Sequence, residues 1–208
     1  MPMDRQEIVD AALDLLDEGG EAGVSMRAVA TRLDVKAPSL YWHFRSKQDL
    51  LEAMADAIVA DMGDVAVGDG DPSEQLFTLL ARFRTSLLAR RDGGRVFAGT
   101  FALGPHVLDL SEAAVPLLLR SGVDDPGDAL DSWFNLVRFT VGSVIEQQSA
   151  VDQPHQVDRR SLFEQLNADR PTMLRVASRI FEPDEDRRYE RGVRQLLRGA
   201  DSPRASTD

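Results

Sequence analysis

The chain has 208 residues, 43% hydrophobic and 28% charged, as in an ordinary globular protein with one large core or two smaller domains. It contains no cysteine, which excludes a disulfide framework, a thiolate metal site and a cysteine nucleophile. The sequence does not open with a basic segment and an apolar run, and no later run reaches the roughly 18 apolar residues that span a bilayer. We therefore expect a cytoplasmic protein with no membrane partner.

The formal net charge is −11 and the pI is about 4.7, which disfavours binding to a polyanion. The charges are unevenly distributed, however. Between Val24 and Gln48 the single acid Asp34 stands against five cations, which are Arg27, Arg32, Lys36, Arg45 and Lys47. This segment predicts a local basic surface, suited to nucleic acid, within an acidic protein.

Capping spacings and apolar periodicity predict four helices in the first 62 residues. Asp4 and Glu7 have the spacing of a capping box, and Gly19 and Gly20 follow the first apolar stripe. A second, short helix is predicted after an N-cap at Ser25. The third is expected to open at Pro38, and the fourth near Ser46.

Residues 63–72 are rich in glycine and aspartate and lack helical periodicity, which predicts a linker. Helical patterns resume with an expected N-cap at Ser73, and residues 152–160 read as a mobile loop. The run over residues 129–145 is apolar around most of its circumference, as in a central buried helix, which predicts a position in the core or in an interface. The predicted fold is all-α: an N-terminal three-helix helix-turn-helix domain with a connecting helix (1–62), a C-terminal helical domain (73–199) and a disordered tail (200–208).

Two short helices joined by a tight turn have the dimensions of a helix-turn-helix, whose second helix enters the major groove. Leu40 and Phe44, four residues apart, are expected to point inward. The predicted DNA contacts combine groups that bind phosphates with groups that reach base edges: Ser25, Arg27, Lys36, Ala37, Pro38, Ser39, Tyr41, Trp42, His43 and Lys47. Taken singly, Tyr41 and Trp42 also fit core residues, and Arg27 fits a solvated surface charge.

The segment SMRAVATRLDVKAPSLYWHFRSKQDLLEAMADAI resembles the DNA-binding domain of the TetR family of repressors. The resemblance continues in RRDGGRVFAGT, FTVGSVIEQQ and YERGVRQLLRG, and so covers nearly the whole chain. It implies a repressor of a palindromic double-stranded DNA operator, released by a small-molecule effector that binds the C-terminal domain. It also implies a homodimer, with helices over residues 133–148 and 189–197 forming a four-helix bundle. Ala37 replaces a glutamine that reads a base in tetracycline-responsive members, so we expect a different operator.

The same members hold drug-bound magnesium through a histidine, and Phe97 stands in its place. Gly63 and Leu79 occupy two further positions that contact the drug, and neither side chain forms hydrogen bonds. We therefore expect an apolar or aromatic effector, not magnesium-tetracycline, and no metal or cofactor. The predicted lining residues are Phe83, Phe97, Phe101, Leu130, Trp133 and Val137, with polar contacts from Thr100, His106 and Glu146. The aromatic residues also fit an ordinary core, and His106 also fits the start of a helix.

Catalysis is not expected. The three histidines, His43, His106 and His155, are far apart in the sequence, and no phosphate-binding loop or nucleophile motif occurs. The sequence leaves open a regulator that responds to a partner protein or to no ligand, and one that activates transcription.

Overall fold

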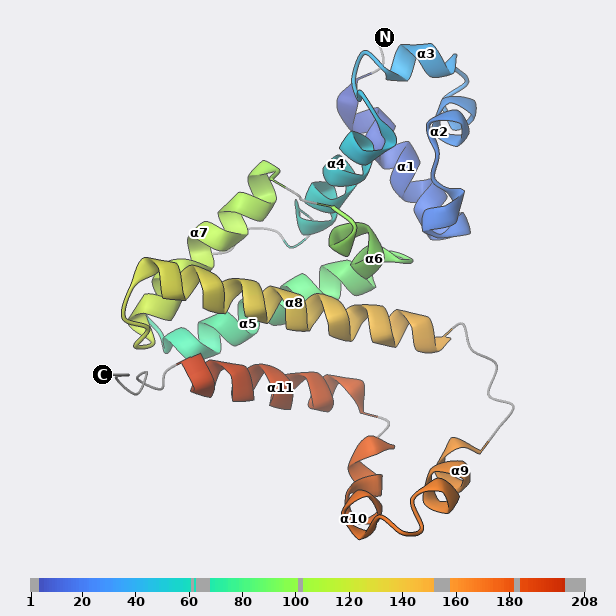
Figure 1. Ribbon diagram of the computed structural model, residues 1–208. Helices are drawn as coiled ribbons and strands as arrows, with labels where there is room; N and C mark the ends of the chain where they lie inside the picture. Colours follow the sequence, from blue (N-terminus) through green and yellow to red (C-terminus); the bar gives the residue numbers. More distant parts are fainter. Residues whose placement is uncertain are drawn as a thin grey trace.

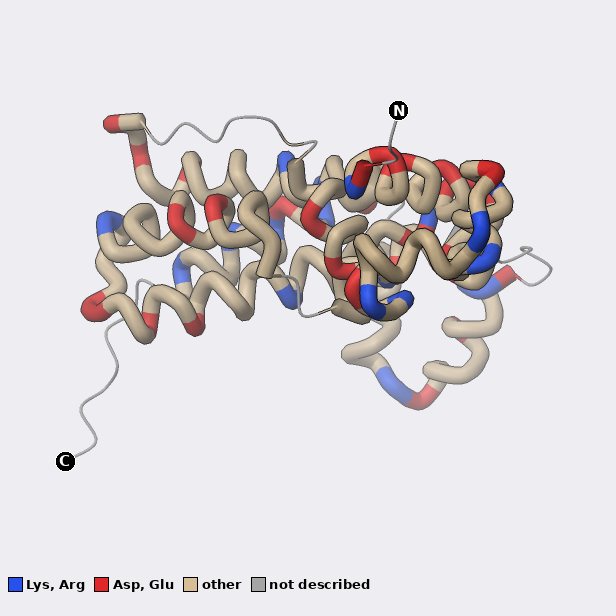
Figure 2. Tube along the Cα trace, turned by 90° about the horizontal axis from the view of Figure 1, so that it is seen from above, with Lys and Arg blue, Asp and Glu red and all other residues tan. Residues whose placement is uncertain are grey.

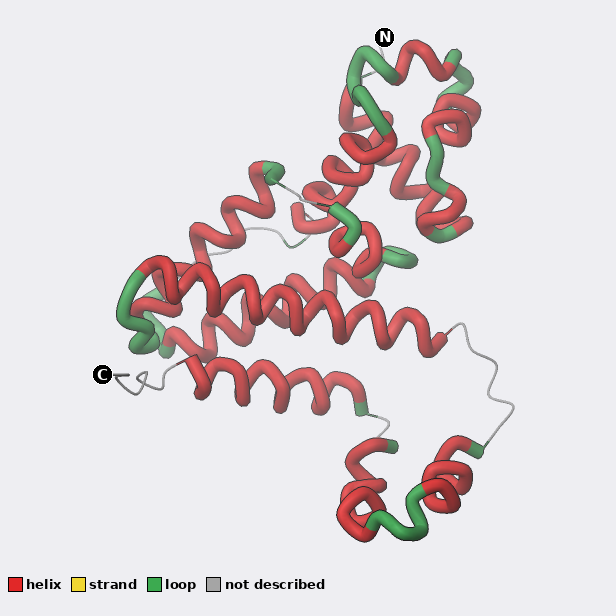
Figure 3. The backbone as a smooth tube through the Cα atoms, in the orientation of Figure 1, coloured by secondary structure: helices red, strands yellow, loops and turns green. Residues whose placement is uncertain are grey.

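The computed structural model describes residues 4–60, 62, 68–100, 103–151, 158–181 and 184–200. Within these ranges every regular element is a helix, and the helices are joined by short loops (Figure 3). None of them is long and apolar enough to cross a membrane. The predicted mobile loop falls partly, and the predicted tail almost entirely, on residues outside the described ranges.

The N-terminal part begins with three helices. Helix α1 (Arg5–Gly19) starts with the predicted capping box, in which the Asp4 carboxylate accepts a hydrogen bond from the Glu7 amide at 2.8 Å. A 3-10 turn, η1 (Glu21–Gly23), leads to α2 (Met26–Arg32), and α3 (Ala37–Leu40) is a single turn. We refer to α1, α2 and α3 together as the three-helix unit.

Helix α4 (Lys47–Ala60) runs from the three-helix unit into the rest of the molecule (Figure 1). It packs against α1 on one side and against α5 (Pro72–Leu88), α6 (Gly93–Ala98) and α7 (Pro105–Arg120) on the other. It is therefore the element shared by the two parts of the chain.

The long helix α8 (Pro126–Val151) crosses the molecule and contacts α5, α6, α7 and α11 (Glu185–Ala200). Helices α9 (Arg159–Leu166) and α10 (Pro171–Ile180) form a separate pair beside this body (Figure 1). One continuous core is formed by residues of α1 to α8 and α11, and no residue of α9 or α10 belongs to it.

One sequence prediction needs correction. The N-cap of α5 is Asp71, which accepts a hydrogen bond from the Glu74 amide at 2.9 Å, because Pro72 rather than Ser73 opens the helix. The long helix, predicted to lie in the core or in an interface, is not buried all round in the protomer: Leu130 and Phe134 of α8 are 39% and 41% exposed. Its apolar circumference therefore includes one face that no other part of the described chain covers.

Candidate functional site

The turn after α3 separates inward from outward side chains sharply. Leu40 and Phe44 are 0% and 1% exposed, as predicted, and they anchor the turn in the core. Between them, Tyr41 is 52% and Trp42 is 90% exposed. The alternative that these two aromatic residues belong to the core is therefore wrong, and the chain presents them to solvent.

Nine of the ten predicted DNA-contact residues lie on α2, α3 and the adjoining turns, and Lys47 is the first residue of α4. All ten are on or near the surface. Ala37, Ser39 and His43 are half-buried, and the other seven, Ser25, Arg27, Lys36, Pro38, Tyr41, Trp42 and Lys47, are exposed. Two hydroxyls already stabilise the backbone: Ser25 Oγ accepts from the Ala28 amide at 3.1 Å, and Ser39 Oγ donates to the Lys36 carbonyl at 2.7 Å. Both oxygens keep further hydrogen-bonding capacity.

Arg5, which sequence reasoning missed, supports this surface from α1. Its guanidinium donates to the His43 carbonyl at 2.7 Å and lies 4.1 Å from the centre of the Phe44 ring. The residue thus holds the turn that carries Tyr41 and Trp42. No periodicity or spacing links positions so far apart in the sequence, so no signal in the sequence pointed to it.

The basic surface is smaller than the sequence count of cations indicates. Arg32 forms ion pairs with Asp14 and Glu18 of α1, so its charge is neutralised within the three-helix unit. The other four cations of the segment, Arg27, Lys36, Arg45 and Lys47, are exposed. Acidic and basic segments therefore alternate over the N-terminal helices (Figure 2).

The loop between α5 and α6 joins the end of α1 to the C-terminal part. Asp17 accepts hydrogen bonds from the Arg90 guanidinium at 2.9 Å and from the Arg91 amide at 3.1 Å. Asp92, whose φ is +54°, accepts from the Glu21 amide at 3.0 Å. The three-helix unit is thus held by polar contacts as well as by α4.

Several predicted effector residues lie in the packed interior of α5, α6 and α8. The Phe83 and Phe97 rings meet edge to face with centroids 5.0 Å apart. Thr100 Oγ1 donates to the Phe97 carbonyl at 3.0 Å. Trp133 is 1% exposed, and its indole N–H donates to Ser111 Oγ of α7 at 3.0 Å.

The remaining predicted effector residues are dispersed. Val137 is half-buried, whereas Leu130 and Glu146 are exposed on α8, and Phe101 lies outside the described residues. His106 is the second residue of α7, where its ring nitrogen Nδ1 lies 2.9 Å from Asp56 of α4. The alternative that His106 belongs to a helix start therefore fits its position.

Comparison with known proteins identifies the family. Residues 8–54 match the model "Bacterial regulatory proteins, tetR family", and residues 66–202 match "Tetracyclin repressor-like, C-terminal domain". The chain belongs to the TetR family. It is accordingly a helix-turn-helix DNA-binding transcription regulator rather than an enzyme.

The relatives of this TetR-family chain include proteins of named function. The tetracycline repressor class A from transposon 1721 of Escherichia coli is 35% identical, with 97% of this chain and 96% of the repressor aligned. A possible TetR family transcriptional regulator from Streptomyces coelicolor A3(2) is 38% identical, with a TM-score of 0.81 and coverage of 94% and 98%. ActR of Streptomyces coelicolor in complex with actinorhodin is 26% identical, with a TM-score of 0.85 and coverage of 96% and 95%.

The acidic side chains of this TetR-family protein do not gather into a metal site in the part of the chain that the structure describes. There, no group of three or more His, Asp or Glu side chains is arranged to hold an ion.

Proposed function

We propose that the protein is a homodimeric repressor that binds a palindromic operator through α3 and its flanking residues. A small apolar or aromatic effector, other than magnesium-tetracycline, releases it from DNA. In this proposal residues 1–62 form the DNA-binding domain with its connecting helix, and residues 73–199 form the effector-binding and dimerisation domain.

The exposed aromatic pair after α3 carries the DNA-binding part of the proposal. Trp42 is 90% exposed and Tyr41 52% exposed, although large aromatic side chains normally gain stability by burial. The exposed cations Lys36 and Lys47 lie five residues before Tyr41 and five residues after Trp42 in the sequence. Such a combination suits phosphate contacts that fix the register and base contacts that read the sequence.

An exposed apolar face supports the dimer. Leu130 and Phe134 lie one turn apart on α8, and Leu196 of α11 is 38% exposed. Helices α8 and α11 pack together, so a second copy placed on this face forms a four-helix bundle. A dimer sets its two α3 segments at the spacing that a palindrome requires, about 34–36 Å for adjacent turns of DNA.

Two observations support an effector in the interior of α5, α6, α7 and α8. The Phe83 and Phe97 rings, with Trp133 on the neighbouring helix, supply an aromatic surface with few hydrogen-bonding groups. The structural neighbour ActR was also crystallised with actinorhodin and with (S)-DNPA. Phe97 offers no metal ligand, which argues against a magnesium complex.

Selection of duplexes from a random pool tests the DNA-binding part. We expect the wild-type protein to enrich a palindrome and Tyr41→Ala to enrich none. Enrichment of a sequence without two-fold symmetry contradicts the dimeric operator, and no enrichment contradicts specific DNA binding.

Thermal unfolding with a panel of aromatic small molecules tests the effector part. A compound at 100 times its dissociation constant adds ~2.7 kcal/mol to the free energy of unfolding. We expect such a compound to release the selected DNA and to lose its effect in Phe97→Ala. Magnesium-tetracycline is expected to change neither the free energy of unfolding nor the binding to DNA. If no compound acts, a partner protein or constitutive binding replaces the effector hypothesis.

A further inference from the structure

A buried carboxylate joins the helix that leads to the DNA-binding surface to a helix of the C-terminal part. Asp56 of α4 is 9% exposed, and the other buried residues of this helix are all apolar. Burial of a charged group is unfavourable unless its oxygens are hydrogen-bonded. Here Oδ1 accepts from the Val107 amide of α7 at 3.1 Å, and Oδ2 lies 2.9 Å from Nδ1 of His106.

Asp56 therefore caps α7 from another helix. The first amides of a helix lack partners within the helix, and a side chain at the N-cap usually accepts one of them. The N-cap of α7 is Gly104, which has no side chain, and Pro105 follows it without an N–H. The carboxylate of α4 takes the place of the missing cap.

Gly104 makes this close approach sterically feasible. A Cβ at position 104 would lie 2.1 Å from Cγ and 2.6 Å from Cβ of Asp56. Atoms at such distances overlap, so any larger residue separates the start of α7 from α4. The contact is thus built from both sides, by a buried acid and by a residue without a side chain.

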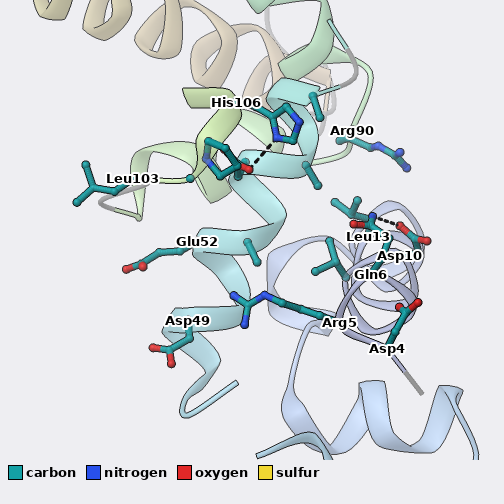
Figure 4. Close-up of a pocket in the computed structure, with 17 residues that line it drawn as sticks. Asp4, Arg5, Gln6, Asp10, Leu13, Asp49, Glu52, Arg90, Leu103 and His106 are labelled. Carbon is teal, nitrogen blue, oxygen red and sulfur yellow. Dashed lines mark hydrogen bonds and ion pairs between the residues drawn. The ribbon is translucent and has the colours of Figure 1, made fainter. Parts of the chain in front are cut away.

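A cleft beside the contact leaves it without packed support on that side. The cleft has a volume of about 830 Å³ and lies between α1, α4 and the start of α7 (Figure 4). Asp56, Gly104 and His106 all line it, opposite Arg5 and Leu13 of α1. On this side the cleft separates the start of α7 from the three-helix unit. The hydrogen bonds to Asp56 therefore hold the start of α7 in place.

Hydrogen bonds connect this contact to the proposed effector region. The Trp133 indole donates to Ser111 Oγ, and the Ser111 hydroxyl donates to the Val107 carbonyl at 3.2 Å. The amide of the same residue, Val107, donates to Asp56. A path of hydrogen bonds therefore runs from Trp133 to Asp56 of α4 through a single turn of α7.

We propose that Asp56 is a positioning residue that couples the effector region to the DNA-binding surface by fixing α4 against the start of α7. This inference rests on the proposed function, since the position of α4 sets the separation of the two DNA-binding surfaces in the dimer. With the link broken, the two surfaces are no longer held at one separation. Variants that break the contact test whether it couples the two regions.

The preference of the protein for one half-site spacing over another tests the contact between Asp56 and the start of α7 without any effector. The probe is the selected palindrome, compared with the same duplex carrying one additional central base pair. We expect the wild type and Glu52→Ala, an acid of the same cleft one turn earlier on α4, to prefer the original spacing by about tenfold or more. In Asp56→Ala the preference falls below about threefold. Gly104→Ala forces the two helices apart and is expected to lower the preference in the same way. It serves as the test variant if Asp56→Ala fails to fold.

A second measurement separates this inference from the proposed function. The chain has no cysteine, and a Cβ at Gly19 meets no atom within 4 Å, so Gly19→Cys accepts a spin label on α1. We expect one narrow label-to-label distance in the wild-type dimer and a broad distribution in Asp56→Ala or Gly104→Ala. Failure to select a palindrome overturns the proposed function alone. An unchanged distance distribution in both variants, with or without DNA, overturns the role of Asp56.

Discussion

The hydroxyl of Tyr189 on α11 lies 2.9 Å from Thr140 Oγ1 on α8 and donates to the Leu80 carbonyl of α5 at 3.1 Å. The Arg84 guanidinium lies 4.8 Å from the centre of the same ring, and it reaches Gln147 and Asp186 at 2.7 Å each. One largely buried polar cluster therefore ties α5 to α8 and α11, the two helices that carry the proposed dimer face.

Replacement of Tyr189 by Phe is expected to change stability in a pH-dependent way. At neutral pH the free energy of unfolding of the variant is lower by about 1–2 kcal/mol, because Thr140 and the Leu80 carbonyl lose a buried partner. Burial raises the pKa of Tyr189 to about 12. Between pH 10 and pH 12 the phenol ionises in the unfolded chain but stays neutral in the folded protein, which favours unfolding. The contribution of Tyr189 to stability is therefore complete below pH 10 and declines as the pH rises toward 12.

The free energy of unfolding of the wild type should therefore fall by about 1 kcal/mol by pH 11. Position 189 causes no such fall in the Phe variant, because phenylalanine does not ionise. Urea unfolding at pH 8 and pH 11, at fixed protein concentration, measures the difference between them. We expect it to shrink at pH 11, and a constant or larger difference contradicts the role given to the phenol.

The contact between α8 and α11 depends on the absence of a side chain at Gly192. A Cβ there would lie 2.2 Å from Cζ of Phe139, whose ring stacks on Tyr189. Gly192→Ala is expected to destabilise the fold by about 1–3 kcal/mol, because Phe139 must leave its position. Gly199→Ala is the control, since a Cβ there meets nothing within 4 Å and alanine favours helix. Equal melting temperatures for the two variants would show that the helices are not packed this closely.

Trp42→Ala is expected to separate DNA binding from stability. The side chain is 90% exposed, so its removal leaves the free energy of unfolding nearly unchanged. Affinity for the selected duplex should fall about tenfold or more, because a contact beside the phosphates is lost. Leu166→Ala, at a 63% exposed residue of α9, is the control and keeps wild-type affinity. Loss of folding in Trp42→Ala, or unchanged DNA affinity, would contradict the exposed position or the DNA contact.

Phe134→Glu tests the dimer face of α8. A carboxylate buried between two copies weakens association by about 2–4 kcal/mol, so monomers should appear at concentrations where the wild type is dimeric. Sedimentation velocity measures the two species. Leu108→Glu changes a 51% exposed residue of α7 in the same way and should remain dimeric. A dimeric Phe134→Glu protein would place the interface elsewhere.

The sequence predicted those features that follow from local pattern. Capping spacings located α1 and α2, and periodicity placed Leu40 and Phe44 in the core. The order of helices and the family also followed, because a long stretch of sequence carries the resemblance. Exposure of Trp42 did not follow, since an aromatic residue fits a core as well as a surface.

Residues whose role depends on a distant partner could not be predicted. His106 was predicted as a polar contact of the effector, with a helix start as the alternative; it stands at the start of α7, and its partner Asp56 lies fifty positions earlier in the sequence. Asp56 itself gave no signal, because a single acid on an amphipathic helix normally faces water. Arg5 and Arg84 likewise contact residues that lie 38 and 102 positions away in the sequence.

Fluorescence anisotropy of the selected duplex, at two salt concentrations and against a scrambled duplex, tests the central claim most directly. We expect the wild type to bind the selected duplex about a thousandfold or more tightly than the scrambled one at physiological salt, and Tyr41→Ala to lose this difference. Equal, weak and steeply salt-dependent binding of both duplexes by the wild type would contradict sequence-specific repression.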